Sequence, residues 1–279
     1  MTVLFARPRV ALVALCLSLA GAPIVASAQQ PFVEFPGRPL YDRFGVEAVD
    51  LFDLRGQLSG STLIDVRPLL EYDILHIEGA HHVDLGSDDF DEQIRALEEE
   101  HGSPLVFYCN GRQSYAGYRA AARANELGVA AAQAYDAGMQ DWVERYPGLA
   151  RFRGEPANEA EDELISDDAF EARMLVADEF SRRARQSGDE VVVVDIRSHG
   201  ERDEISLFGG REVGAPLSDI GDLDRIVDQA RRNEQTLLIF DQYGQQVRWL
   251  QYHLEQRGVH DYYFLEGGLQ RFYDEVMAR

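Results

Sequence analysis

The chain of 279 residues carries 49 acidic against 27 basic side chains, which leaves a formal net charge of -22 at pH 7. Such an excess of carboxylates repels phosphate backbones and anionic lipid surfaces, so the composition argues against nucleic acid and membrane surfaces as partners. Hydrophobic residues at 45% are typical of a globular protein, and the length allows two domains.

Residues 1–28 have the pattern of a secretory signal peptide. Two arginines precede an uncharged apolar run at 10–22, and the small residues Ala26, Ser27 and Ala28 follow it. A membrane-spanning helix needs about 20 apolar residues, which is longer than this run, so we expect cleavage and export rather than an anchor. The sequence therefore predicts a periplasmic or secreted protein.

After cleavage, Cys109 is the one cysteine left, because the other, Cys16, lies in the apolar run. Exported proteins meet an oxidising compartment, where cysteines usually occur in even numbers as disulfides. A single thiol cannot pair within the chain. Cys109 is therefore either a buried apolar side chain or a residue kept for its reactivity.

The rest of the chain contains one pattern twice. Asp65 and Asp195 each end a strand-like apolar run, 130 residues apart, and Cys109 and Asp241 each follow another such run, 132 residues apart. The spacing predicts a duplicated domain with a two-residue difference in the loop after the second of these strands. We expect an N-terminal copy at 29–152 and a C-terminal copy at 169–279, joined by a solvated acidic linker at 153–168.

Within each copy, short apolar strands alternate with helical stretches, for example at 88–100, 115–127 and 219–232. This alternation predicts an α/β fold in which helices cover both faces of a parallel sheet. In open sheets of this kind, ligands bind beyond the carboxyl ends of the strands. Cys109 directly follows the apolar run at 105–108, so we expect it at such an end.

The segment from Cys109 to Ser114 reads as a tight turn that enters a helix. Backbone N–H groups at the start of a helix have no partner within it, and the helix dipole adds partial positive charge, so the turn can hold an anion. Arg112 adds a cation, Gly111 permits a tight backbone and the Ser114 hydroxyl can cap the helix. The sequence predicts that Cys109 has a lowered pKa and acts as a nucleophile.

Several segments of the N-terminal copy together resemble the rhodanese sulfurtransferases in order and spacing. They are Asp65-Val66-Arg67, Glu71-Tyr72, His76-Ile77-Glu78-Gly79-Ala80, Tyr108-Cys109 with its loop, and Gly138-Met139-Gln140-Asp141-Trp142. The resemblance implies two tandem rhodanese-like domains. It also implies a loop cysteine that takes sulfane sulfur from a donor such as thiosulfate, becomes a persulfide and passes the outer sulfur to a thiophilic acceptor such as cyanide or a thiol.

Carried onto this chain, the resemblance makes Cys109 the nucleophile and implies no cofactor. The partners would be small sulfur-containing anions and thiols, or a periplasmic protein that accepts sulfur. The residues expected to bind substrate are the rest of the loop and one arginine: Asn110, Gly111, Arg112, Gln113, Ser114 and Arg67. For Arg67, a salt bridge that fixes the loop is the favoured interpretation, because most such pairs are structural.

The C-terminal copy departs from this pattern, because Asp241 stands where the nucleophile would be and this half contains no cysteine. It cannot form a persulfide. A carboxylate would satisfy the loop's donors itself and repel an anionic substrate. We therefore expect an active N-terminal copy and an inactive C-terminal copy, the reverse of the familiar arrangement in two-domain members of the family.

Two other functions fit parts of the sequence. Some rhodanese-like domains are phosphatases or arsenate reductases, but these need a longer loop and an arginine six positions after the cysteine, where this chain has Tyr115. A non-catalytic binding or redox-regulatory module with a packed Cys109 stays open. A metal site is not expected, because the adjacent His81 and His82 would point to opposite faces of an extended segment.

Overall fold

The computed structural model describes residues 35, 38, 44–102, 104–129, 131–185, 190–202, 208 and 210–277. The predicted signal peptide at 1–28 lies outside the described residues. Within them, no helix has the length and apolar character needed to cross a membrane.

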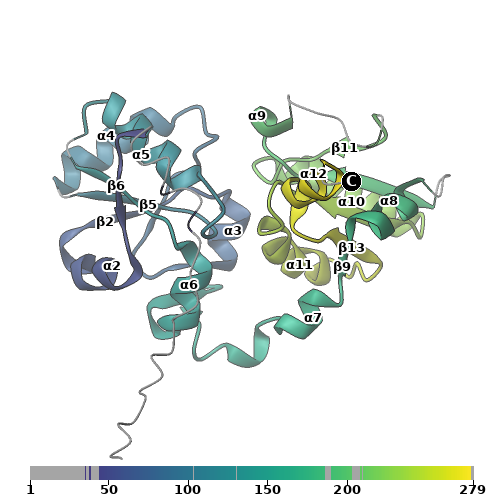
Figure 1. Ribbon diagram of the computed structural model, residues 1–279. Coiled ribbons are helices and arrows are strands. Elements are labelled where there is room, and N and C mark those ends of the chain that lie inside the picture. The colour runs from purple at the N-terminus through teal and green to yellow at the C-terminus, as the bar shows by residue number, and fades with distance from the viewer. Residues whose placement is uncertain are drawn as a thin grey trace, which may run out of the picture. The chain divides into compact units, whose positions relative to one another are not determined.

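The described residues of the N-terminal copy form a five-stranded parallel sheet in the order β1-β6-β5-β2-β4 (Figure 1). Its strands are β1 (Glu47–Val49), β6 (Ala132–Tyr135), β5 (Leu105–Tyr108), β2 (Thr62–Asp65) and β4 (His81–His82). Every residue of β2 and β5 is buried. Burial of both faces requires cover on both sides, which the apolar strand sequences predict.

Helices pack on the two faces of this sheet, and β5 shows how the side chains divide between them. Val106 and Tyr108 join a hydrophobic cluster with Trp142, while Phe107 and Cys109 join a second cluster on the opposite face. The alternation follows from the period of two in a strand. The helices are α2 (Leu51–Gln57), α3 (Leu69–Ile74), α4 (Phe90–His101), α5 (Ala116–Glu126) and α6 (Gly138–Arg145).

The C-terminal copy repeats this architecture. Its parallel sheet has the order β11-β10-β12-β13-β9, which is the order of the first sheet with equivalent strands in equivalent places. The strands are β9 (Met174–Leu175), β10 (Val191–Asp195), β11 (Val213–Gly214), β12 (Thr236–Phe240) and β13 (Tyr262–Leu265). The helices are α7 (Asp167–Glu171), α8 (Ala177–Arg185), α9 (His199–Arg202), α10 (Ile220–Arg232), α11 (Gln246–Gln256) and α12 (Gly268–Met277).

The segment at 153–168 is more ordered than a solvated linker. Part of it, β8 (Glu155–Pro156), belongs to a small antiparallel sheet with β7 (Ala150–Phe152) and β3 (Leu75–Ile77). Ala157 and Ala160 are buried in the core of the N-terminal copy. The acidic composition concealed this packing, because small apolar residues placed among the acids are enough to bury the segment. Short 3-10 turns occur at Leu58–Gly60, Pro147–Leu149 and Glu161–Glu163.

The hydrophobic core of the N-terminal copy includes side chains from the C-terminal copy. Trp249 and Tyr252 of α11 are buried in it, and α11 packs against α3. The ring of Tyr252 lies 5.3 Å from that of Phe152. Helix α11, which follows the Asp241 loop, therefore reaches the elements that support the Cys109 loop.

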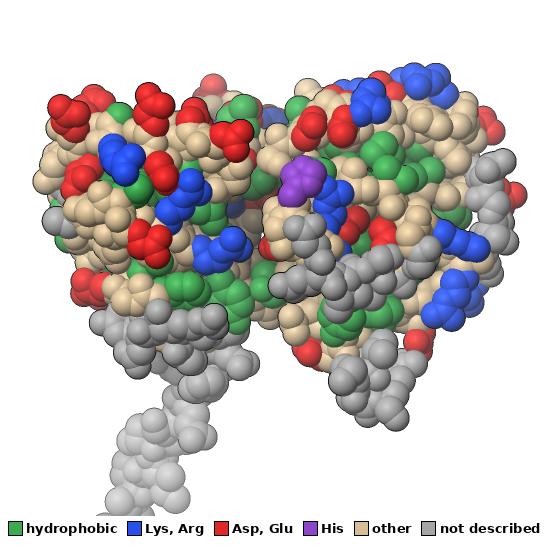
Figure 2. Space-filling view, turned by 90° about the horizontal axis from the view of Figure 1, so that it is seen from above, with side chains coloured by type: hydrophobic (Ala, Val, Ile, Leu, Met, Phe, Trp, Pro, Cys, Tyr) green, Lys and Arg blue, Asp and Glu red, His purple; other side chains and the backbone are tan. Residues whose placement is uncertain are grey.

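The surface charges are mixed. On the face that Figure 2 shows, arginines lie among the acidic side chains. Some of the acidic side chains form ion pairs with arginine, such as Arg123–Asp91 and Arg257–Asp228.

Candidate active site

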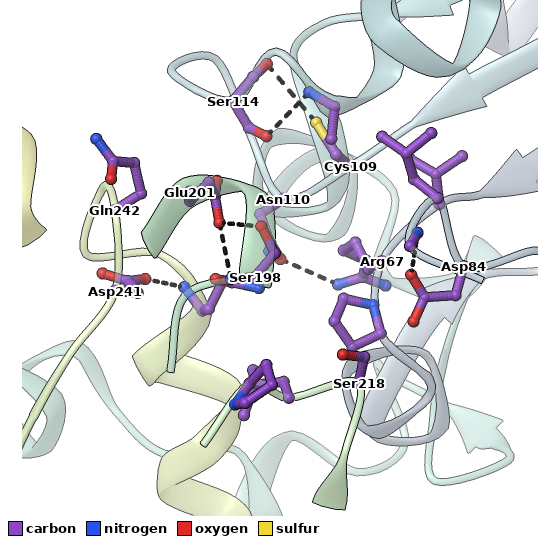
Figure 3. Close-up of a pocket in the computed structure, with 18 of the residues that line it drawn as sticks. Arg67, Asp84, Cys109, Asn110, Ser114, Ser198, Glu201, Ser218, Asp241 and Gln242 are labelled. Carbon is purple, nitrogen blue, oxygen red and sulfur yellow. Dashed lines mark hydrogen bonds between the residues drawn. The ribbon is translucent and has the colours of Figure 1, made fainter. Parts of the chain in front are cut away.

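Cys109 lies directly after β5, at the carboxyl end of the first sheet, where the alternation of strands and helices predicts it. Its side chain is 2% exposed and packs in the cluster with Phe107. The thiol donates a long hydrogen bond to the main-chain oxygen of Ser114, with 3.8 Å between sulfur and oxygen (Figure 3). The Ser114 hydroxyl accepts from the N–H of Ala116, 3.4 Å away, at the start of α5.

The backbone of the Cys109 loop is fixed by the first residues of α6. The carbonyl oxygens of Cys109 and Asn110 accept from the N–H groups of Met139 at 2.9 Å and Gln140 at 3.2 Å. Gly138 permits this approach: it has φ +74°, and a Cβ placed on it would lie 2.4 Å from the nitrogen of Gly111. The Gly-Met-Gln-Asp-Trp segment singled out in the sequence thus holds the loop through backbone hydrogen bonds, and its glycine allows the close approach.

The side chain of Asn110 is buried, and both its oxygen and its nitrogen form hydrogen bonds. Its Oδ1 accepts from Arg67 Nη1 at 3.2 Å and from Nε1 of Trp249 at 2.5 Å, and its Nδ2 donates to Glu71 Oε2 at 2.5 Å. The other oxygen of Glu71 accepts from Gln246 Nε2 at 2.9 Å. Burial raises the pKa of Glu71 to about 7, against the opposing effect of Arg67 and of these hydrogen bonds.

Arg67 is held by its own neighbours. Its Nε and Nη2 donate to the two carboxylate oxygens of Asp65 at 2.8 and 2.6 Å, and Nη2 also donates to the main-chain oxygen of Leu75. This geometry matches the favoured interpretation of a salt bridge that fixes the loop. Asp195 and Arg197 repeat the pair in the C-terminal copy.

A cavity of about 290 Å³ lies between the strand ends of the two copies. The N-terminal copy supplies residues that follow β2, β4 and β5, including Arg67, Asp84 and Cys109, and the C-terminal copy supplies their counterparts after β10, β11 and β12. Figure 3 shows Cys109 and Asp241 on opposite sides of the residues drawn. The cavity is therefore at the place where α/β sheets bind ligands.

The structure places only some of the residues predicted to bind substrate at the cavity. Asn110, Ser114 and Arg67 line the cavity, whereas Gly111, Arg112 and Gln113 do not. Arg112 instead forms an ion pair with Asp141, its Nε lying 2.9 Å from Oδ2, so it is not the cation of the cavity. The sequence distance from Cys109 could not show this, because Asp141 comes from α6.

The sequence analysis did not identify Arg119, which lines the cavity from the first turn of α5. It is exposed and forms no ion pair with any described residue, so its charge is available to an anion in the cavity. Helical spacing gave a signal that was missed, since Arg119 lies one turn after Ala116, where the helix enters from the Cys109 loop.

The expectation of a lowered thiol pKa is wrong for the protein without substrate. Burial raises the pKa of Cys109 above its ordinary value, and the Ser114 side chain and the backbone N–H groups of Gly117 and Gly111 oppose this only in part. The amides that surround Cys109 can still stabilise negative charge that develops on the sulfur during a reaction.

Sequence comparison assigns both halves of the chain to one family. The rhodanese-like domain matches at residues 47–145 and again at 176–275. The chain belongs to the rhodanese family. The two matches confirm the predicted tandem arrangement and the α/β fold of each domain.

The chain is similar to solved structures at low identity. Thiosulfate sulfurtransferase from Pseudomonas aeruginosa is 19% identical with a TM-score of 0.38, over 83% of this chain and 43% of that chain. A human single-domain sulfurtransferase is 25% identical with a TM-score of 0.30, over 36% of this chain and 98% of that chain. This chain thus matches less than half of the Pseudomonas protein, and no curated protein sequence matches it.

In the second rhodanese domain, the loop after β12 is supported in the same way as the Cys109 loop, but it begins with Asp241 in place of a cysteine. Asp241 accepts from the N–H groups of Gly244 at 2.5 Å and Gln246 at 2.7 Å, one for each carboxylate oxygen. The carboxylate thus takes up the donors of its own loop, as the sequence predicts. Burial raises its pKa to about 6, with the backbone donors opposing the rise.

The histidines of the first rhodanese domain pack with other rings or donate local hydrogen bonds to main-chain oxygens. His76 stacks on Tyr72 with ring centroids 4.0 Å apart, and the ring of His81 lies 5.0 Å from that of His101. The described residues contain no group of three metal-ligating side chains.

Proposed function

We propose that the protein is a sulfurtransferase that moves sulfane sulfur through a persulfide on Cys109. The observation that carries the proposal is the place of Cys109 at the carboxyl end of β5, with backbone N–H groups at its sulfur and a cavity before it. Membership of the rhodanese family supports it, because a loop cysteine at this place is the family's nucleophile.

The chemistry requires nothing beyond the thiol and the donors around it. With thiosulfate, Cys109 gives up its proton as its sulfur attacks the outer sulfur, the sulfur–sulfur bond breaks, and sulfite leaves with the bonding electrons and takes up that proton, so the product is an anionic persulfide. Cyanide then attacks the outer sulfur, thiocyanate leaves, and the proton that hydrogen cyanide gives up restores the thiol. The N–H groups of Gly111 and Gly117 would stabilise the charge on sulfur in both steps.

Arg119 is the residue that we propose holds the sulfonate of an anionic donor. It lines the cavity together with Cys109, and its guanidinium is not neutralised by any described carboxylate. The small anions and thiols predicted as partners are consistent with a cavity of about 290 Å³.

Intact-protein mass spectrometry before and after thiosulfate, and again after cyanide, tests the proposal. We expect a gain of one sulfur atom that cyanide removes. The Cys109→Ser variant, which should keep the fold because the side chain is small and its loop is held by backbone contacts, should gain none.

The rival interpretation is a binding or redox-regulatory module with an inert, packed cysteine. It predicts no gain of sulfur by the wild-type protein even when thiol titration shows Cys109 to be reduced. That result would overturn the proposal and direct attention to proteins trapped on Cys109 as mixed disulfides.

A further inference from the structure

The residue next to the nucleophile is held by the domain that lacks a nucleophile. Asn110 follows Cys109 directly, and the indole N–H of Trp249 in α11 donates to its Oδ1 at 2.5 Å, across 139 residues of sequence. Arg67 donates to the same oxygen at 3.2 Å, so both acceptor positions of the amide oxygen are in use.

A second contact from α11 reaches the same network. Gln246, the first residue of the helix, donates to Glu71 Oε1 at 2.9 Å, and Glu71 Oε2 accepts from Asn110 Nδ2 at 2.5 Å. Asn110, Glu71 and Trp249 are all buried, with 7%, 0% and 5% of their surface exposed. In a site shielded from water, each of these hydrogen bonds is costly to leave unmade, so the network has one arrangement.

We propose that Trp249 and Gln246 are positioning residues for the Cys109 loop, and that fixing this loop is the role of the C-terminal rhodanese domain. The inference rests on the proposed function, because it concerns the rate at which Cys109 reacts. Backbone contacts from α6 hold the loop on one side. On the other side, Trp249 holds the Asn110 side chain directly and Gln246 holds it through Glu71.

Loss of the indole N–H changes the reaction through Asn110. The amide oxygen keeps Arg67 alone, and Asn110 can turn within the space that the indole leaves, which moves the adjoining Cys109. Misplacement of a reacting group by about 1 Å lowers a rate by as much as about 100-fold. Arg119, which also lines the cavity and is proposed to hold the donor, is not part of this network, so binding of the donor should be affected less than the rate.

The experiment compares Trp249→Phe with Tyr252→Phe in the full chain. Both residues lie on α11 in the same core, but the hydroxyl of Tyr252 accepts from the N–H of Ile165 at 2.8 Å and does not contact the loop. For Trp249→Phe we expect persulfide formation with thiosulfate to slow by at least tenfold at saturation, with KM within twofold. Tyr252→Phe should react within twofold of the wild type.

A double variant tests whether Trp249 acts through Asn110. In an Asn110→Ala background, Trp249→Phe should cause no further loss of rate, whereas independent contributions would multiply. Losses of rate that multiply in the double variant would overturn the inference. Equal effects of Trp249→Phe and Tyr252→Phe would overturn it as well. If Trp249→Phe fails to fold, Gln246→Met removes the donor to Glu71 at a partly exposed position and should slow the same step.

The rate of Cys109 alkylation by iodoacetamide, measured against pH, separates failure of the inference from failure of the proposed function. A wild-type protein that takes up no sulfur would refute the function. The alkylation profile of Trp249→Phe should still differ from that of wild type and Tyr252→Phe if the loop is held as we propose. Identical profiles in all three proteins would refute the positioning role.

Discussion

The backbone of Asp241 is held in the same way as the backbone of Cys109, by the equivalent residue of the other domain. The carbonyl oxygen of Cys109 accepts from Met139 N at 2.9 Å, and that of Asp241 accepts from Leu269 N, also at 2.9 Å. The helix that supplies each donor begins with a glycine at positive φ, Gly138 at +74° and Gly268 at +64°. The loop support is therefore duplicated, and the position that it holds carries a cysteine in one domain and an aspartate in the other.

This equivalence predicts that the nucleophile can be moved between domains. A Cys109→Ser, Asp241→Cys double variant should gain one sulfur from thiosulfate, because the N–H groups of Gly244 and Gln246 are aimed at the new thiol and the cavity is shared. We expect a rate about 10-fold to 100-fold below wild type, because among the described residues the side chain of Gln242, which takes the place of Asn110, has no counterpart of the hydrogen bond from Trp249 to Asn110.

Mass spectrometry of the double variant beside Cys109→Ser alone checks this prediction. The single variant should gain no sulfur. A double variant that melts near the wild-type temperature and has a reduced thiol, yet gains no sulfur, would show that the loop after β12 cannot support the reaction.

The sequence predicted what depends on local pattern. The strand before Cys109, the helix after it and the duplication all follow from apolar runs and their spacing, and each is present. The partner of Arg112 could not be predicted, because Asp141 reaches it only through the packing of α6. The contact between Trp249 and Asn110 was also beyond sequence reasoning, since it joins two copies that local pattern treats separately.

The pKa of Cys109 shows a different limit. The sequence correctly placed backbone donors at the thiol, and these lower the pKa, but it could not reveal that burial outweighs them. The extent of burial depends on how α5 and the cavity close over the sulfur, which is a property of tertiary packing.

Arg119 and Arg112 should give different defects when truncated. Arg119→Ala removes a cation that pairs with no described carboxylate and should raise KM for thiosulfate about 10-fold to 100-fold with kcat within twofold, since a charged hydrogen bond to substrate is worth about 1.5–3 kcal/mol. Arg112→Ala breaks a partly exposed ion pair with Asp141 and should lower the stability by about 0.2–1 kcal/mol while KM stays near wild type.

Steady-state kinetics with thiosulfate and urea denaturation of both variants make the comparison. A raised KM in Arg112→Ala with no change in Arg119→Ala would reverse the assignment of the substrate cation.

Gly138→Ala should be strongly destabilising because it combines backbone strain with a clash. Gly138 has φ +74°, and its new Cβ would lie 2.4 Å from the nitrogen of Gly111. Gly154 is the matched control, since it has φ +91° but nothing within 4 Å of a Cβ. We expect Gly154→Ala to cost about 1 kcal/mol from strain alone, and Gly138→Ala about 3 kcal/mol or more.

Urea denaturation gives both values. Because the clash is with the Cys109 loop, Gly138→Ala should also slow persulfide formation, whereas Gly154→Ala should leave the rate unchanged. Equal free-energy changes in the two variants would mean that the close approach of α6 to the loop contributes nothing.

Asp241 should make the protein less stable as pH rises. Its carboxyl has a pKa of about 6 in the folded protein and 3.8 as its ordinary value, so between these pH values the folded protein binds more protons than the unfolded chain. The free energy of unfolding therefore falls as pH increases through this window, by up to about 3 kcal/mol from this group.

In Asp241→Asn the contribution is absent. The stability of the variant relative to wild type should thus rise by up to about 3 kcal/mol between pH 4 and pH 7, as measured by urea denaturation. Taking the difference between the two proteins cancels the similar contribution of Glu71, whose pKa is raised to about 7 in both. A difference in free energy of unfolding that does not change with pH, or that increasingly favours the wild type as pH rises, would contradict this prediction. It would show that the donors from Gly244 and Gln246 outweigh burial and that Asp241 remains ionised throughout this range.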